Sequence, residues 1–288
     1  MLEFGSHMSI AGGCDLALTR AAALEIAACQ LFTKNASQWR AKPLDPAVIE
    51  RFHAQRAATG MRHLVAHDSY LINIASPADE LWEKSRLALM EELDRCDQLG
   101  VPYLVSHPGG HMGSGEEVGI RRVAEAINRI HDERPDGASV LLLETTAGQG
   151  TALGRTFEEI AGILSLVEDK QRAAVCLDTC HIFGAGYDLR DQATYDATIN
   201  SFDEVIGLGQ VKVIHLNDSK KALGSRVDRH AHIGEGELGL SAFELLVNDQ
   251  RLAGLPGILE TPKGDNDEDD RRNLATLRSL VREVAAAV

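Results

Sequence analysis

Several features are missing from this sequence of 288 residues, and each absence narrows the class of protein. No apolar run approaches the roughly 18 residues that a membrane-spanning helix needs. The first residues, MLEFGSHMSIAGG, contain neither a basic leader nor a long apolar stretch. We therefore expect no membrane contact and no secretory signal.

Cysteine is scarce. The five cysteines are an odd number, and a chain of this length does not need a disulfide framework to fold. A reducing, cytoplasmic setting is therefore expected.

Positive charge is also in short supply. Lysine and arginine total 29 against 43 aspartates and glutamates, which gives a formal net charge of −14. General nucleic-acid binders usually carry a basic surface, so this balance argues against one. Hydrophobic residues make up 44% of the chain, enough for a large core. No linker rich in proline, glycine and serine divides the chain, so we expect residues 1–288 to form one domain.

The chain consists of short apolar runs that alternate with longer amphipathic segments. The runs are too short for helices and rich in Val, Leu and Ile, as buried parallel strands are. Eight strand–helix units fit a closed (β/α)₈ TIM barrel, with an open doubly wound sheet as the fallback. The eight runs are LEFGSH, ACQLFT, RHLVAH, YLVSHP, VLLLE, AAVCLD, VKVIHL and GILET.

The intervening segments contain signals for helix ends. Asp45-Pro46 predicts a helix start, with Gly60 as its end. Residues 76–100 predict a long helix. Thr156-x-x-Glu159 and Ser241-x-x-Glu244 both match a capping box.

Metal-binding residue types stand at the ends of seven of the eight runs. Only the second run, which ends near Thr33, lacks one. In a barrel these ends share the C-terminal face, where active sites form. So many ionisable groups would be costly to desolvate together, and bound cations would remove that cost. The seven residues are His7, His67, His107, Glu144, Asp178, His215 and Glu260.

Three further groups fit the same face. His181 lies three residues beyond Asp178, and Asp228 and His230 would share one side of an extended segment, with His232 as a spare. Nitrogen and oxygen ligands indicate a catalytic zinc or manganese site rather than a closed thiolate site. Cys176 is expected inside the barrel wall, and Cys180 has no C-x-x-C partner.

The other four histidines look less organised. His53 and His131 fall in helical segments and are expected at the surface. His63 begins the third run, at the opposite end of the barrel. His111 follows the fourth run and could support the metal ligands from outside.

These segments resemble the endonuclease IV family of apurinic/apyrimidinic endonucleases, and the matching stretches run through nearly the whole chain. LDTCHIFGAGYD and DRHAHIGEG are the most specific of them. The others are GSHMSIAGG, LFTKNASQW, HDSYLINIASP, SHPGGH, TAGQG, HLNDSK and ILETP.

The resemblance implies a TIM barrel that binds three zinc ions, with manganese also suited to some sites. Its implied reaction is cleavage of double-stranded DNA 5′ to an abasic site, which leaves a 3′-hydroxyl and a 5′-deoxyribose phosphate. Glu144 and Glu260 are the implied catalytic residues. The implied ligands are His67, His107 and Glu144 for the first ion, Glu144, Asp178, His215 and Glu260 for the second, and His181, Asp228 and His230 for the third.

The family also implies DNA-contacting loops after the early strands. Tyr70 would intercalate, and Lys34, Asn35 and Trp39 would approach the minor groove. The family often has a basic residue where this chain has Ser37, so the loop would penetrate DNA less well. Simple packing is the other reading of Trp39. No obligate protein partner is expected.

Two other functions stay open from the residues alone. A metal-dependent sugar isomerase or epimerase on the same barrel would need only a smaller set such as Glu144, Asp178, His215 and Glu260. A non-catalytic protein that binds damaged DNA and retains the metals is the second.

Overall fold

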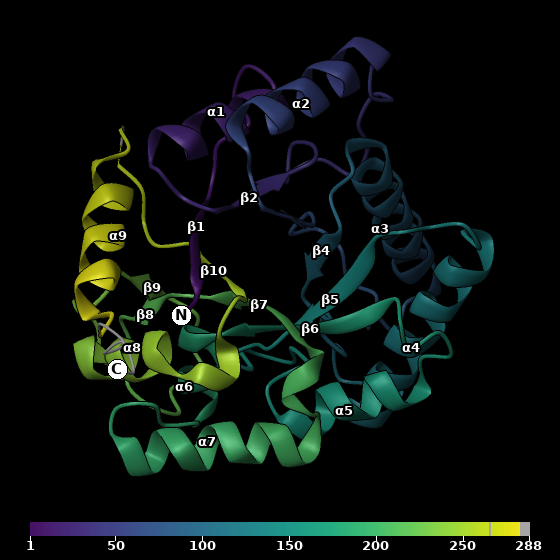
Figure 1. The fold of residues 1–288 in the computed structure, drawn as a ribbon. Helices are drawn as coiled ribbons and strands as arrows, with labels where there is room; N and C mark the ends of the chain where they lie inside the picture. Colours follow the sequence, from purple (N-terminus) through teal and green to yellow (C-terminus); the bar gives the residue numbers. More distant parts are fainter. Residues whose placement is uncertain (265, 283–288) are drawn as a thin grey trace.

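The computed structural model describes residues 1–264 and 266–282, and its centre is a closed barrel of eight parallel strands. The hydrogen-bonded order around the barrel is β1-β10-β7-β6-β5-β4-β3-β2, which confirms the predicted architecture (Figure 1). The barrel strands are β1 (Glu3–His7), β2 (Ala28–Phe32), β3 (His63–His67), β4 (Tyr103–Ser106), β5 (Val140–Glu144), β6 (Ala173–Asp178), β7 (Val211–His215) and β10 (Pro256–Leu259).

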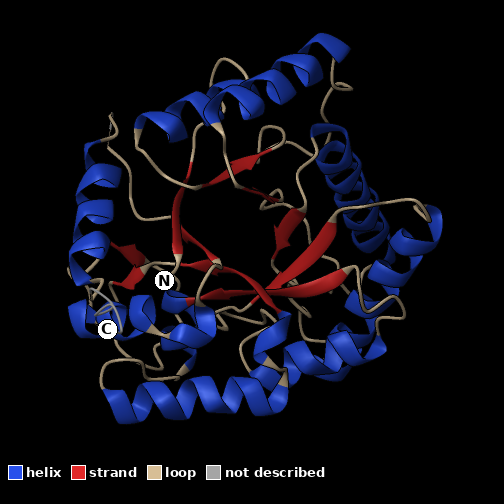
Figure 2. Ribbon diagram, viewed as in Figure 1, coloured by secondary structure: helices blue, strands red, loops and turns tan. Residues whose placement is uncertain are grey.

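Helices surround this barrel on the outside (Figure 2). A two-stranded sheet of β8 (Asp218–Ser219) and β9 (His230–Ala231) lies in the β7–α8 connection. The helices are α1 (Cys14–Ala23), α2 (Pro46–Thr59), α3 (Asp79–Leu99), α4 (Glu116–Glu133), α5 (Phe157–Leu166), α6 (Thr179–Ala185), α7 (Gln192–Val205), α8 (Gly239–Asn248) and α9 (Glu268–Leu280), with short 3₁₀ turns at Leu208–Gln210 and Gln250–Leu252.

Small and branched side chains fill the interior of the barrel. Because neighbouring residues of a strand point to opposite sides, one side chain in two faces inward. Gly5 occupies the inward position of β1, where an added Cβ would lie 2.5 Å from the Ala28 carbonyl oxygen. The buried inner cluster consists of Ala28, Val65, Val105, Leu142, Ala174, Cys176, Val213 and Ile258.

The residues at the barrel mouth lie two positions beyond this inner layer. Because side chains alternate along a strand, the next inward-facing residue comes at or just beyond the strand end. The sequence places His67 two residues after Val65 and Glu144 two after Leu142. Cys176 belongs to the inner layer, as predicted, so Asp178 stands above it.

The helix-end signals were only partly right. Asp45 caps α2 by accepting a hydrogen bond from the Ala47 N–H, and Gly60 ends the helix with φ 63°. Gly100 likewise ends α3. The Thr156 side chain caps α5, but the Glu159 carboxylate accepts from Gly154 and Arg155 instead of closing the box. The second box was wrong, because α8 begins at Gly239 and Ser241 lies inside it.

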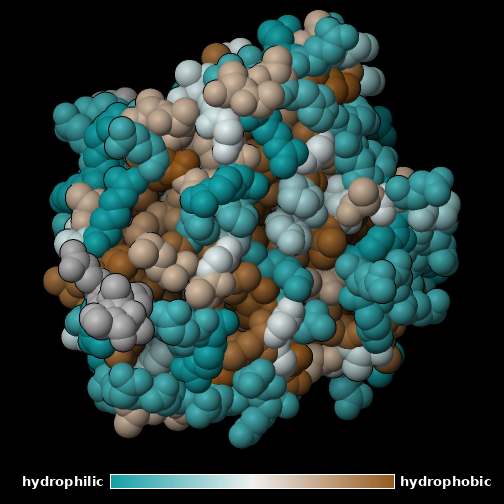
Figure 3. Space-filling view, viewed as in Figure 1, coloured by the Kyte–Doolittle hydropathy of each residue, from teal (hydrophilic) through white to brown (hydrophobic). Residues whose placement is uncertain are grey.

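The face of the molecule that Figure 3 shows is polar over most of its helices. On this face, hydrophobic residues show chiefly in the recesses between the helices. Among the described residues, no helix combines the length and the apolar character that crossing a membrane requires. All five cysteines are buried free thiols.

Candidate metal centre

Side chains from the barrel strands and two loops converge at the C-terminal mouth of the barrel. Within each of several groups, one nitrogen, oxygen or sulfur atom per residue lies within 4.8 Å of all the others. All nine predicted ligands belong to these groups: His67, His107, Glu144, Asp178, His181, His215, Asp228, His230 and Glu260.

Glu144 at the end of β5 is the centre of the arrangement. Its Oε2 lies 3.1 Å from His67 Nε2 and 3.0 Å from His107 Nε2. Its Oε1 lies 2.9 Å from His215 Nδ1 and 3.2 Å from His181 Nδ1. One carboxylate thus faces two groups of histidines, one with each oxygen.

The second group surrounds the ring of His215. Glu260 Oε2 lies 3.1 Å from His215 Nδ1, and Asp178 Oδ2 lies 3.8 Å from it. His215, Asp178 and Glu144 are fully buried. Three carboxylates around one imidazole nitrogen give this group the highest negative charge of the site.

The third group lies toward the β8–β9 sheet. His181 Nε2 lies 3.2 Å from Asp228 Oδ2, and His230 Nε2 lies 3.3 Å from Asp228 Oδ1. His230 Nε2 also approaches Asp178 Oδ2 at 3.9 Å. Asp228 therefore stands between two imidazoles, as Glu144 does.

Backbone carbonyl oxygens orient three of the histidines. His67 Nδ1 donates to the Asp68 carbonyl at 3.0 Å, His181 Nδ1 to the Thr145 carbonyl at 2.8 Å, and His230 Nδ1 to the Glu260 carbonyl at 3.1 Å. Each bond leaves Nε2 of that ring to face the carboxylates. Metal-binding histidines are usually held this way, with the second nitrogen donating to a fixed acceptor.

Buried charges of opposite sign shift the acid–base equilibria of the site. Burial alone would lower the pKa of His67, but its hydrogen bond to Glu144 and the nearby carboxylates raise it to about 9. Burial alone would raise the pKa of Glu144, yet His107 and His215 hold it well below its usual range. The imidazoles and carboxylates therefore favour each other's charged forms.

The donor atoms fit divalent cations. His230 Nε2 is buried and has no hydrogen-bond partner, although it points at two carboxylates. Cys180 also lies within reach of Asp228 and His230. Burial raises the pKa of its thiol to about 12, so the thiolate that binds metal is disfavoured. Imidazole and carboxylate ligands of this kind suit zinc and manganese.

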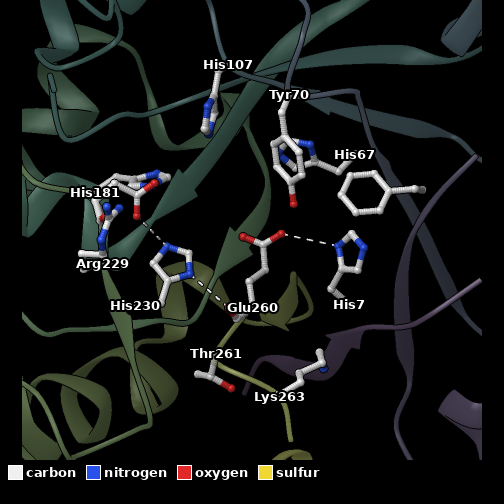
Figure 4. A pocket seen from close by; sticks show the side chains of 12 residues that line it. His7, His67, Tyr70, His107, His181, Arg229, His230, Glu260, Thr261 and Lys263 are labelled. Carbon is white, nitrogen blue, oxygen red and sulfur yellow. Dashed lines mark hydrogen bonds and ion pairs between the residues drawn. The ribbon is translucent and has the colours of Figure 1, made fainter. Parts of the chain in front are cut away.

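The cluster forms the floor of an open pocket of about 410 Å³ (Figure 4). Tyr70 and Phe32 provide aromatic surface on its wall, and Arg229 and Lys263 are its cationic residues. Tyr70 is 73% exposed and also lines a neighbouring groove of about 470 Å³, with Gly109 and Gly148. An anionic ligand that reaches the cluster would pass these side chains.

The loop after β2 holds the other three residues that were predicted to contact DNA. Asn35 is exposed, whereas Trp39 is half-buried, with Lys84 Nζ 4.1 Å from its ring centroid. Lys34 is only 4% exposed, and its Nζ lies 3.5 Å from Glu92 Oε1. It also donates to the Trp39 carbonyl at 3.0 Å. Their contacts with DNA stay a prediction.

The remaining histidines needed one correction. His131 was expected at the surface, but it is buried near the C-terminal end of α4, with 7% of the residue exposed. His53 is exposed and His63 begins β3, as expected. The spare candidate His232 interacts with Asn273. His111 accepts hydrogen bonds from the N–H groups of residues 113 and 115.

Sequence reasoning missed one residue of the mouth. The apolar pattern ends run two near Thr33 without a ligand-type residue, but β2 ends at Phe32 and its inward positions are Ala28 and Gln30. Gln30 is fully buried and contacts both His215 and Glu260. Gln30 could have been predicted from its position two residues after Ala28, which belongs to the inner layer.

The fold and the cluster together define a TIM barrel with several groups of potential metal ligands at its C-terminal mouth. A family model described as xylose isomerase-like TIM barrel matches residues 18–280. The chain is 56% identical over 286 residues to "Probable endonuclease 4" of Chloroflexus aggregans, covering 99% of this chain and 100% of that protein. The chain belongs to the endonuclease IV family.

Solved structures agree with this assignment. The crystal structure of endonuclease IV from Thermus thermophilus is 40% identical, has a TM-score of 0.86, and covers 96% of this chain and 98% of its own. A D-tagatose 3-epimerase-like protein also superimposes, with a TM-score of 0.72, 17% identity, and coverage of 97% of both chains. At that identity only the fold is shared.

Proposed function

We propose that this protein hydrolyses the phosphodiester bond 5′ to an abasic site in double-stranded DNA, leaving a 3′-hydroxyl and a 5′-deoxyribose phosphate. The observation that carries this proposal is the position of Glu144 between two groups of histidines, with a third group beside them. A single-ion sugar enzyme would have no use for all three groups.

Three zinc ions are the proposed cofactors, with manganese as a substitute at some positions. The first ion would be held by His67, His107 and Glu144, whose ligand atoms lie within 4.8 Å of one another. Bound divalent cations lower the pKa of water and neutralise charge on the oxygens of a phosphodiester. The second ion would be held by Glu144, Asp178, His215 and Glu260. The third would be held by His181, Asp228 and His230, because Asp228 lies between the two imidazoles.

Glu144 and Glu260 are the proposed catalytic carboxylates. Glu144 would keep the first two groups at a fixed separation, because its two oxygens face different histidines. Glu260 lines the pocket, with 17% of its side chain exposed, so its carboxylate borders the space that the reacting phosphate would occupy. Both carboxylates would stay ionised, because the surrounding imidazoles hold their pKa values well below the usual range even though burial opposes this.

The pocket suits a nucleotide that lacks its base. Such a nucleotide has lost stacking and pairing, so moving it out of the duplex costs little free energy. Tyr70, exposed at the rim and 5.5 Å from Phe32 between ring centroids, would fill the space left in the stack. Lys34, Asn35 and Trp39 would position the β2–α2 loop against the minor groove.

Local charge offsets the acidity of the chain. Three divalent cations would add six positive charges at the pocket floor, against a formal net charge of −14 spread over the whole protein. Arg229 lies at the same pocket, whereas the charge of Lys263 is paired with Asp270. DNA would therefore meet a positive field at the site despite the overall charge.

An abasic-site duplex tests the proposal. We expect a single nick on the 5′ side of the lesion, lost on treatment with a chelator and restored by zinc. An intact abasic duplex in the presence of zinc would contradict the proposal. Tight binding of that duplex without a nick would identify a damaged-DNA binder instead. A cytoplasmic location also stays a prediction, and five buried free thiols are compatible with it.

A further inference from the structure

Gln30 has a non-ionisable side chain, unlike the other seven inward-facing residues at the barrel mouth. Those seven are His7, His67, His107, Glu144, Asp178, His215 and Glu260. Strand β2 places it two residues beyond Ala28 of the inner layer. It is fully buried, so neither solvent nor DNA reaches it. A buried amide needs hydrogen-bond partners, and those of Gln30 are residues of the proposed metal centre.

The partners fix the orientation of the amide. Gln30 Nε2 lies 2.5 Å from Glu260 Oε1, and an ionised carboxylate only accepts hydrogen bonds. The NH₂ group must therefore face Glu260. Its second hydrogen points to His7 Nδ1 at 3.0 Å.

The same orientation fixes the tautomer that His215 adopts when its ring is neutral. Gln30 Oε1 is an acceptor and lies 2.8 Å from His215 Nε2, so that nitrogen carries the hydrogen. The lone pair of the neutral ring is then on Nδ1, which faces Glu144 and Glu260. His215 is therefore oriented by a side chain, whereas His67, His181 and His230 are held by backbone carbonyls.

We propose that Gln30 is a positioning residue of the metal centre: it holds His215 with Nδ1 toward the second cation and holds Glu260 in the same group. This inference rests on the proposed function only for the identity of the reaction, because the hydrogen bonds concern cation binding alone. Residues that hold metal ligands typically change metal affinity by about 10–100-fold when they are removed.

The variant Gln30→Met keeps the length of the side chain and removes all three hydrogen bonds of the amide. Gln30→Asn keeps an amide that is too short to reach Glu260 and His215 together, and it serves if Gln30→Met does not fold. Ser139→Ala is the matched control. Ser139 is buried and donates to Asp97 Oδ1, but it precedes β5 and so lies at the opposite end of the barrel from Glu144.

Zinc alone is the first probe, measured by competition with a chromophoric chelator. We expect three zinc ions in the unmodified protein, and one of the three to bind about 10–100-fold more weakly in each Gln30 variant. With cobalt(II) in place of zinc, the visible absorption band of one ion should shift, since its ligand geometry changes. The Ser139→Ala variant should show neither effect, whatever its loss of thermal stability.

Kinetics on the abasic duplex give the second readout. Because Gln30 is buried beneath the pocket, kcat should fall while KM for DNA stays unchanged. Wild-type zinc affinity in a folded Gln30 variant, or an affinity loss no larger than that of Ser139→Ala, would overturn the inference. The zinc measurement contains no DNA, so a protein that binds three ions but leaves the duplex intact would contradict the proposed function alone.

Discussion

Asp178 Oδ1 accepts a hydrogen bond from the backbone N–H of His181 at 2.7 Å. This bond caps the N-terminus of α6, and the other oxygen, Oδ2, accepts from Asn217 Nδ2 at 2.7 Å and faces the histidines of the metal centre. One carboxylate therefore both starts a helix and contributes to the site. The two roles can be separated, because asparagine caps helices nearly as well as aspartate does.

We predict that Asp178→Asn abolishes the binding of at least one cation but leaves the fold intact. The substitution keeps an oxygen for the His181 N–H and removes the negative charge. Zinc stoichiometry and circular dichroism measure the two effects. Asp45→Asn, at the equivalent cap of α2 on the barrel exterior, is the control and should leave zinc binding unchanged. A folded Asp178→Asn protein with three tightly bound zinc ions would contradict the prediction.

Glu144→Gln should reduce cleavage by about 10²–10³-fold while the fold is retained, as expected for loss of a group that organises the reacting centre. Glutamine turns one acceptor oxygen into a donor, which would face His67 and His107 or else His181 and His215. Single-turnover nicking of an abasic duplex measures the loss. Near-normal cleavage by this variant would rule out the central role of Glu144.

The buried His131 predicts a pH dependence of stability that is independent of the metal centre. Burial, followed by the nearby charge of Arg172, lowers its pKa to about 4 from an ordinary value of 6.5. Between these values the unfolded chain binds the extra proton, so stability is lost as the pH falls from 6.5 to 4. At about 1.4 kcal/mol per pKa unit, the loss approaches about 3 kcal/mol.

Urea unfolding at several pH values tests this dependence. His131→Gln should lose about 3 kcal/mol less stability than the unmodified protein between pH 6.5 and pH 4. His53→Asn removes an exposed histidine and should preserve the original slope. Parallel pH curves for the unmodified and His131→Gln proteins would show that His131 makes no such contribution.

Lys34 should affect stability as well as any contact with DNA. Its ammonium group is buried against Glu92, and removing one partner of a buried ion pair costs about 3–5 kcal/mol. Lys34→Met should therefore lower the free energy of unfolding by roughly that amount. Asn35→Ala, in the same loop but exposed, should change only KM for abasic DNA. Unchanged stability of Lys34→Met would show that the buried pair is not formed in solution.

The sequence allowed the barrel to be predicted because its parallel strands are short, apolar and evenly spaced. The ligands followed from the same regularity, since His67, Glu144 and Asp178 end their runs and parallel strands end at one face. Asp228 and His230 lie in the β8–β9 segment and not at a barrel strand end, so their two-residue spacing indicated them and the motif resemblance assigned them to the third ion.

Three features were not predicted correctly because each depends on the local conformation of one element. Gln30 was missed because it stands three residues before the assumed run end at Thr33, and only the inward alternation from Ala28 identifies it. His131 was misplaced because its position in a helical segment does not by itself reveal which face of the helix is buried. The capping box predicted at Ser241 was wrong because α8 begins two residues earlier, at Gly239.

Elemental analysis of purified, catalytically active protein tests the central claim most directly. The convergence of nine nitrogen and oxygen ligands on Glu144 and its neighbours predicts three divalent cations per chain. One ion per chain, or active protein with no bound transition metal, would contradict it.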